Sequence, residues 1–108
     1  MQESKFTQKL LKALRSHPRL HSAVIFKHND RSTRGIPDFS ISIGVRTLWF
    51  EVKVGKNNPT KIQAYFLKKL STGAVLLRNS GAITWFTDNE YFEFAELVEI
   101  IVRRCINA

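Results

Sequence analysis

Two segments of alternating apolar and polar residues, 38–43 (DFSISI) and 47–54 (TLWFEVKV), lie on either side of Gly44-Val45. This period of two is typical of β-strands with one buried face. The apolar positions are Phe39, Ile41 and Ile43 in the first segment and Leu48, Phe50, Val52 and Val54 in the second. A slip of one residue would turn one set to the other face. The pattern therefore predicts a hairpin with a two-residue type II′ loop and Ile43 opposite Arg46.

This register has a chemical consequence for the other face of the hairpin. Counting back from the turn places Asp38 opposite Glu51, and Lys53 follows Glu51 on the same side of its strand. Because Pro37 cannot donate to a ladder, Asp38 is expected at the first position of its strand, near the rim of the sheet. Two neighbouring carboxylates resist joint ionisation unless a positive charge lies between them. Magnesium, which binds one or two carboxylates together with waters and phosphate oxygens, fits such a pair.

Lys53 adds a group that would orient a water and meet charge developing on phosphorus. The E-x-K triplet alone is common in proteins of this length, so a structural ion pair without a catalytic role is the alternative. The combination is more specific, because the triplet occurs with a Pro-Asp at a strand start and with a basic chain.

The remaining elements follow from apolar periodicity and from turn residues. We expect a first helix that ends before Pro18, a strand at 23–26, a second helix from Asn58-Pro59 to Gly73, strands at 74–77 and 83–86 separated by Asn79-Ser80-Gly81, and a last helix over 94–105. The predicted order is αβββαββα in a mixed α/β fold. Without a repeat, a linker or a low-complexity tract, residues 1–108 are expected to form a single domain.

The charge of the chain points to a polyanionic partner. Lys and Arg number 17 against 9 Asp and Glu, a net charge of +8. Such a surface attracts phosphate backbones. The sequence has no apolar run of the roughly 20 residues that cross a bilayer and no secretion signal, so we expect a soluble, cytoplasmic protein without a membrane partner. The single cysteine, Cys105, excludes an internal disulfide and gives no basis for a structural zinc.

The string GIPD at 35–38, the EVK at 51–53 and Gln63 together resemble the PD-(D/E)xK nuclease superfamily. Within it, the chain is most similar to the VRR-NUC family in its free-standing phage or bacterial form, whose pattern also has a lysine before the Pro-Asp, matched by Lys27. The similarity runs from about residue 23 to residue 73. It implies a restriction-endonuclease-like αβββαβ core, here with an extra strand and a C-terminal helix.

The resemblance also implies roles for individual residues. Asp38 and Glu51, with the backbone carbonyl of Val52, would bind Mg²⁺ or Mn²⁺, Lys53 would be the catalytic lysine, Gln63 would support the lysine or the water, and Glu3 would complete the site. The pattern around Glu3 leaves two readings open: an inward carboxylate on the stripe of Phe6 and Leu10, or a first-turn acid favoured by the helix dipole.

Six side chains are candidate nucleic-acid contacts. Arg31 and Arg34 lie in the turn before the site, where a guanidinium matches phosphate bidentately, although an ordinary loop arginine is the alternative for each. The others are Lys27, Lys56, Lys61 and Tyr65, which have ordinary surface or packing roles as their alternatives.

The resemblance implies a Mg²⁺- or Mn²⁺-dependent endonuclease that cuts branched DNA, such as Holliday junctions, by direct attack of water. It implies a homodimer, which would present two sites to two strands, and no organic cofactor. Two alternatives stay open: a catalytically inactive nucleic-acid-binding module, and a nuclease for flap, single-stranded or RNA substrates.

Overall fold

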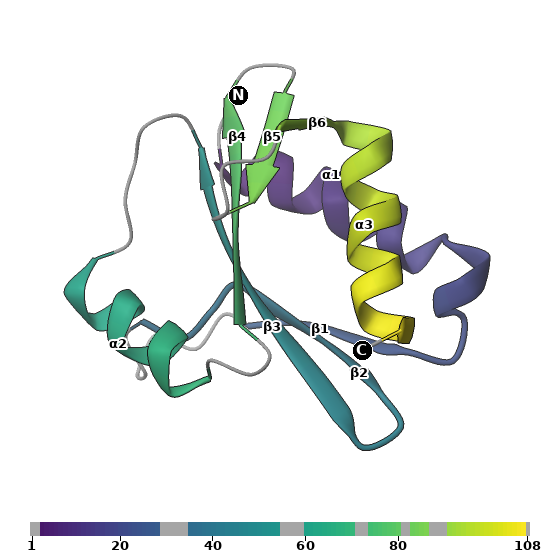
Figure 1. Ribbon diagram of the computed structural model, residues 1–108, viewed down its shortest axis with the longest axis horizontal. Coiled ribbons are helices and arrows are strands. Elements are labelled where there is room, and N and C mark those ends of the chain that lie inside the picture. Colours follow the sequence, from purple (N-terminus) through teal and green to yellow (C-terminus); the bar gives the residue numbers. More distant parts are fainter. Residues whose placement is uncertain are drawn as a thin grey trace.

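The computed structural model describes residues 3–28, 35–54, 60–70, 74–80, 83–86 and 91–107, which form a six-stranded mixed sheet, three α-helices and a short 3₁₀-helix, Pro18–Leu20 (Figure 1). The strands are β1 (Val24–Lys27), β2 (Phe39–Ile43), β3 (Arg46–Val54), β4 (Ala74–Ser80), β5 (Ile83–Phe86) and β6 (Tyr91–Glu93), and they lie in the sheet in this order. Neighbours are antiparallel except for β3 and β4, which are parallel and are connected through α2 (Lys61–Lys69). The expected mixed α/β architecture is confirmed.

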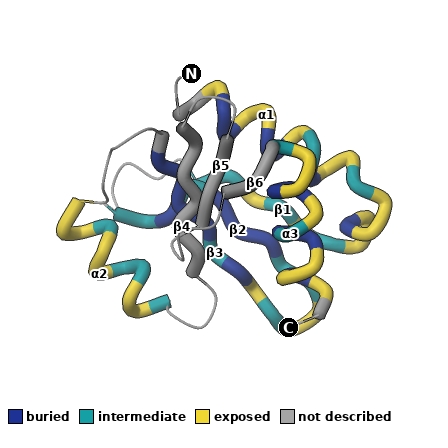
Figure 2. Tube along the Cα trace, turned by 45° about the horizontal axis from the view of Figure 1, so that its top comes forward, coloured by how far each residue is buried: buried dark blue, intermediate teal, exposed yellow. Residues whose placement is uncertain are grey.

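The core lies between one face of the sheet and two helices, α1 (Glu3–Arg15) and α3 (Phe94–Asn107), which lie together at the right of Figure 1. In Figure 2 the buried stretches of β2 and β3 contrast with α2, which has no buried residue. The fully buried side chains include Phe39, Ile41, Phe50 and Val52 from the sheet, Leu10 and Leu14 from α1, and Leu97, Ile101 and Val102 from α3. Each large apolar side chain contributes roughly 1.5–3 kcal/mol when buried, so this layer fixes which face of the hairpin turns inward.

The β2–β3 hairpin has the predicted register. Ile43 pairs with Arg46 across a two-residue loop, and Phe39 pairs with Phe50, with the two rings stacked at a centroid distance of 4.9 Å. Gly44 has a φ of +59°, which suits the first central position of a type II′ turn. Hydrophobic alternation and turn chemistry therefore favour the same pairing.

Two predicted boundaries are wrong, and one strand was not predicted. The second helix begins at Lys61, with Thr60 as its N-cap, and not at Asn58-Pro59. The reason is a capping box in which the Thr60 hydroxyl accepts from the Gln63 N–H and the Gln63 side chain accepts from the Thr60 N–H. The expected turn residues Asn79 and Ser80 belong to β4 and pair with β5, and the three-residue strand β6, too short to show a period, was not predicted.

Cys105 is part of the core. Its side chain is buried, and this burial raises the pKa of the thiol to about 11, against a smaller lowering by Arg46. The sulfur is therefore protonated at neutral pH and packs as a small apolar group. Within the described residues, no helix combines the length and the apolar character needed to cross a membrane.

Candidate functional site

Asp38 lies one residue before β2, at the point where three strands come together. Because Phe39 pairs with Phe50, continuing the register by one residue places Asp38 beside Glu51. The Val52 N–H donates a hydrogen bond of 2.7 Å to Asp38 Oδ2, which fixes the carboxylate against β3. On the other side, the His28 N–H donates to the Asp38 carbonyl at 2.8 Å. The backbone and the side chain of Asp38 are thus held by both neighbouring strands.

Glu51 and Lys53 lie two residues apart on β3 and share the face opposite the core. The Lys53 Nζ is 3.5 Å from Glu51 Oε1, and the two side chains are only 11% and 3% exposed. A buried ion pair gives little net stability, because the desolvation of both charges offsets their attraction. Apolar residues would stabilise the sheet at least as well, so stability alone does not account for this pair.

The site lies on what we call the polar face of the hairpin, which carries Asp38, Ser40, Ser42, Thr47, Trp49, Glu51 and Lys53. Val52, between the two charged residues, points into the core and has no exposed surface. The backbone of Val52 reaches the site through its N–H, which binds Asp38, while its role as a carbonyl ligand stays a prediction.

The segment before Asp38 packs closely against α2. Gly35 has a φ of +82°, and a β-carbon at this position would lie 2.9 Å from the Ile62 carbonyl oxygen. A larger residue would therefore meet the backbone of α2 and would also be strained by its φ. This close approach brings the first turn of α2 to the segment that leads into the site.

The other two residues that the resemblance assigns to the site are placed less directly. Gln63 lies in the first turn of α2, and its side-chain oxygen accepts the Thr60 N–H at 2.9 Å, so this oxygen is already used to cap the helix. Glu3 is the first residue of α1, a helix that contacts β3, and its side chain lies outside the described residues. The roles of both stay predictions.

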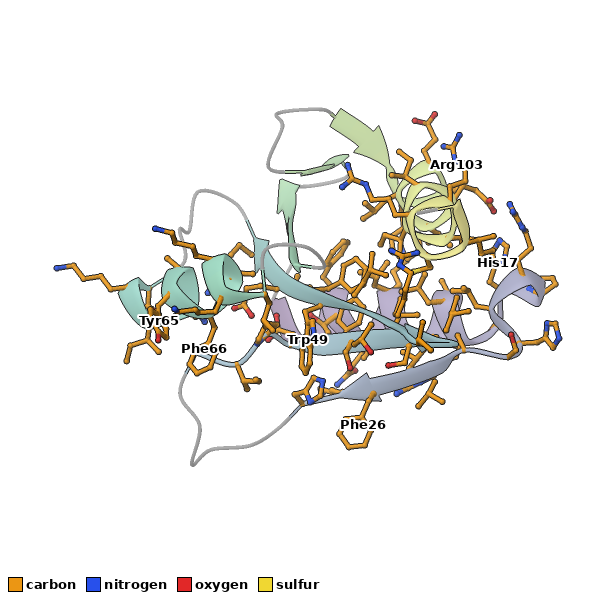
Figure 3. All side chains as sticks on the ribbon, turned by 60° about the horizontal axis from the view of Figure 1, so that its bottom comes forward. His17, Phe26, Trp49, Tyr65, Phe66 and Arg103 are labelled. Carbon is orange, nitrogen blue, oxygen red and sulfur yellow. The ribbon has the colours of Figure 1, made fainter. Side chains whose placement is uncertain are left out.

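Of the six candidate nucleic-acid contacts, the three that the structure describes do not form one group. Arg31, Arg34 and Lys56 lie outside the described residues. Lys61 and Tyr65 are exposed on α2, where the Lys69 ammonium lies 5.6 Å from the centre of the Tyr65 ring (Figure 3). Lys27 pairs with Phe39 and so projects from the opposite face of the sheet to Glu51 and Lys53, toward α1.

Sequence reasoning missed a row of aromatic rings beside the site. The His28 ring stacks on Trp49 at 4.9 Å and lies 5.1 Å from the ring of Phe26. The His28 Nε2 and the Ser40 hydroxyl share a hydrogen bond of 2.9 Å, and burial lowers the pKa of the imidazole, which favours its neutral form. The signal was available, because the period of two places Phe26 and Trp49 on the same face once β1 pairs with β2.

The donor set of the site suits a hard divalent cation. Among the side chains that the structure describes, no three of His, Cys, Asp and Glu come together. Magnesium does not require such a set, because one or two carboxylates are enough when waters and phosphate oxygens fill its other positions. Asp38 and Glu51, neighbours across β2 and β3, offer carboxylate oxygens of this kind. Histidine and thiolate ligands, which favour zinc, are not part of the pair.

Comparison with known proteins identifies no family for the chain: none of the known protein families matches it, and no curated protein is detectably similar in sequence.

Proposed function

We propose that this protein is a Mg²⁺- or Mn²⁺-dependent endonuclease that hydrolyses phosphodiester bonds of DNA. The observation that carries this function is the position of Asp38 beside Glu51 at the start of β2, with the Lys53 ammonium 3.5 Å from Glu51. The net charge of +8 supports a polyanionic substrate. The PD-(D/E)xK pattern, and within it the VRR-NUC pattern, supports the same reaction through resemblance.

Asp38 and Glu51 would hold the metal, with the Val52 carbonyl and Glu3 as further ligands implied by the resemblance. When bound, the ion would lower the pKa of a water and neutralise charge on the scissile phosphate. Asp38 is already oriented for this task, since the Val52 N–H fixes one of its oxygens. The Asp38 and Glu51 carboxylates supply the negative charge that a divalent cation requires.

Lys53 would act on the substrate. Its position beside Glu51 keeps the ammonium close to the carboxylates, where it donates hydrogen bonds to a phosphate oxygen or to the attacking water. Attack of water on phosphorus breaks the bond to one sugar oxygen and leaves a phosphate monoester and a hydroxyl. A pre-positioned ammonium stabilises the charge that builds up on the phosphoryl oxygens during this step.

The proposed substrate class follows from the resemblance. We propose selection of DNA shape, as in a four-way junction, and a homodimer that presents two sites to two strands. Phosphate contacts position a protein on DNA without reading sequence. An inactive binding module, or a nuclease for flap, single-stranded or RNA substrates, is distinguished by a cleavage assay on all of these substrates.

The test incubates the protein with labelled four-way junction, flap, duplex, single-stranded DNA and RNA, each with Mg²⁺, Mn²⁺ or EDTA. Wild type is expected to cleave with either metal and not with EDTA, and light scattering under the same conditions reports the oligomeric state. Lys53→Arg is the matched variant, because it keeps a positive charge beside Glu51 but replaces a compact ammonium with a planar guanidinium.

Lys53→Arg is expected to lower the cleavage rate by roughly 100-fold or more, while DNA affinity in EDTA stays close to that of wild type. Cleavage by Lys53→Arg at the wild-type rate would contradict the proposed catalytic role of the Lys53 ammonium. Metal-independent binding without any cleavage by wild type would favour the inactive binding module.

A further inference from the structure

A basic groove lies between α1 and β1, on the face of the sheet that carries the core. Its volume is about 430 Å³, and of the described residues that line it, Lys12, Arg15 and Lys27 are basic and none is acidic. The Arg15 guanidinium also donates a 3.3 Å hydrogen bond to the Ile25 carbonyl, which holds this side chain against β1. Three cations without an acid between them suit phosphate groups.

An exposed aromatic ring lies on the other side of the same strand. Phe26 is 59% exposed and projects from the face opposite to Lys27, because successive residues of a strand alternate. Figure 3 shows Phe26 and Trp49 on the side of the sheet away from α3. The Phe26, His28 and Trp49 rings follow one another from β1 toward β3, with centroid distances of 5.1 Å and 4.9 Å. Phe26 thus ends the row with a ring open to solvent.

The strand that joins these two features is the first strand of the sheet, and it leads to the candidate site. β1 has β2 as its neighbour in the strand order, and the residue after β1, His28, donates its N–H to the Asp38 carbonyl at 2.8 Å. A linear ligand that crosses β1 would therefore have phosphate-binding cations on one side, an aromatic ring on the other, and Asp38 at the end of the strand.

We propose that an unpaired nucleic-acid strand, such as one opened at a branch point of DNA, crosses the sheet edge at β1, with a base stacked on Phe26 and its phosphates held by Lys12, Arg15 and Lys27. The further claim that this strand leads to the Asp38–Glu51 pair rests on the proposed function. Single-strand binding proteins combine a positive groove with stacking rings in this way, because every base has a π-face. Bases inside a duplex are already stacked on one another and do not offer that face.

A second copy of this chain is a less suitable occupant of the same surface. Only Val24 and Phe26 are large exposed apolar side chains on β1, whereas a stable interface buries about 800 Å² on each partner. The Arg15 contact to the Ile25 carbonyl also occupies one acceptor of the strand edge that a second strand would use. The positive charge beside the ring favours a polyanion instead.

The test measures binding of a labelled oligothymidylate and of a duplex of equal length by fluorescence anisotropy in EDTA, so that cleavage plays no part. Phe26→Ala is expected to weaken binding of the single strand roughly ten-fold or more and to leave duplex binding unchanged. Phe26→Tyr, which keeps a ring, should bind like wild type. Val24→Ala is the matched control, because it removes an exposed apolar side chain from the same strand and the same face.

Lys27→Ala should lower the salt dependence of single-strand binding, with the slope of log affinity against log salt falling by about one. Equal single-strand affinities of wild type and Phe26→Ala would overturn the proposed path. So would a change from dimer to monomer in Phe26→Ala without a change in affinity, since the surface would then be an interface between copies.

The outcome is separable from that of the nuclease assay. Phe26-dependent binding by a protein that never cleaves would support the strand path and would refute the catalytic function. Metal-dependent cleavage by a protein whose single-strand affinity is unchanged in Phe26→Ala would support the catalytic function and would refute the strand path across β1.

Discussion

Asp38→Asn is expected to lower the metal-dependent cleavage rate by roughly 10²–10³-fold or more without unfolding the protein. The asparagine side-chain oxygen can still accept the Val52 N–H, which now bonds Asp38 Oδ2 at 2.7 Å. The change removes one of two negative charges and little else. The measurement compares the cleavage rates of wild type and Asp38→Asn, with Mg²⁺ and with Mn²⁺, on the substrate that wild type cleaves fastest.

Glu96→Gln is the matched control for Asp38→Asn. Glu96 is an exposed acid on α3, the helix that covers the other face of the sheet. Its replacement by glutamine makes the same change in net charge as Asp38→Asn. This control should cleave like wild type, and both variants should keep the wild-type melting temperature. Equal cleavage by Asp38→Asn and wild type would show that Asp38 is not part of the active site.

The second large effect concerns stability. Lys53→Met leaves the Glu51 carboxylate buried without the ammonium at 3.5 Å, and the free energy of unfolding should fall by about 3–5 kcal/mol. The double variant Glu51→Leu/Lys53→Met removes both charges and should recover a stability close to that of wild type. Urea unfolding at neutral pH measures all three proteins.

The double variant is also expected to have lost cleavage completely. A protein that is stable without its ion pair but inactive would show that the pair is kept for chemistry and not for the fold. The contrary result is a double variant far less stable than Lys53→Met, which would make Glu51 and Lys53 structural residues.

The sequence predicted those parts of the fold that depend on local period and turn chemistry. Alternation in 38–43 and 47–54, with glycine at the first position of the loop, was enough to give the pairing of Ile43 with Arg46. Counting residues back from that pair is enough to place Asp38 beside Glu51. A register shifted by one residue would turn Phe39 to the opposite face of the sheet, so the burial of Phe39 excludes that pairing.

One error arose where hydrogen bonds of side chains decide the local structure. The start of α2 depends on a reciprocal pair of hydrogen bonds between Thr60 and Gln63, which competes with the Pro59 signal and prevails. One of these bonds, from the Thr60 N–H, occupies the side-chain oxygen of Gln63, a residue that the resemblance assigns to the site. The role of Lys27 as a nucleic-acid contact stays a prediction, and its strand position directs its side chain toward α1, on the opposite face of the sheet to Glu51 and Lys53.

The binding of Mn²⁺ to wild type, Asp38→Asn and Glu51→Gln, followed by the loss of the free-ion signal in electron paramagnetic resonance, tests the central claim most directly. Wild type is expected to bind Mn²⁺, and each variant is expected to bind it at least about ten-fold more weakly, because each carboxylate supplies the ion with an oxygen ligand and a negative charge. Equal Mn²⁺ affinity in all three proteins would contradict the claim that Asp38 and Glu51 bind the same ion.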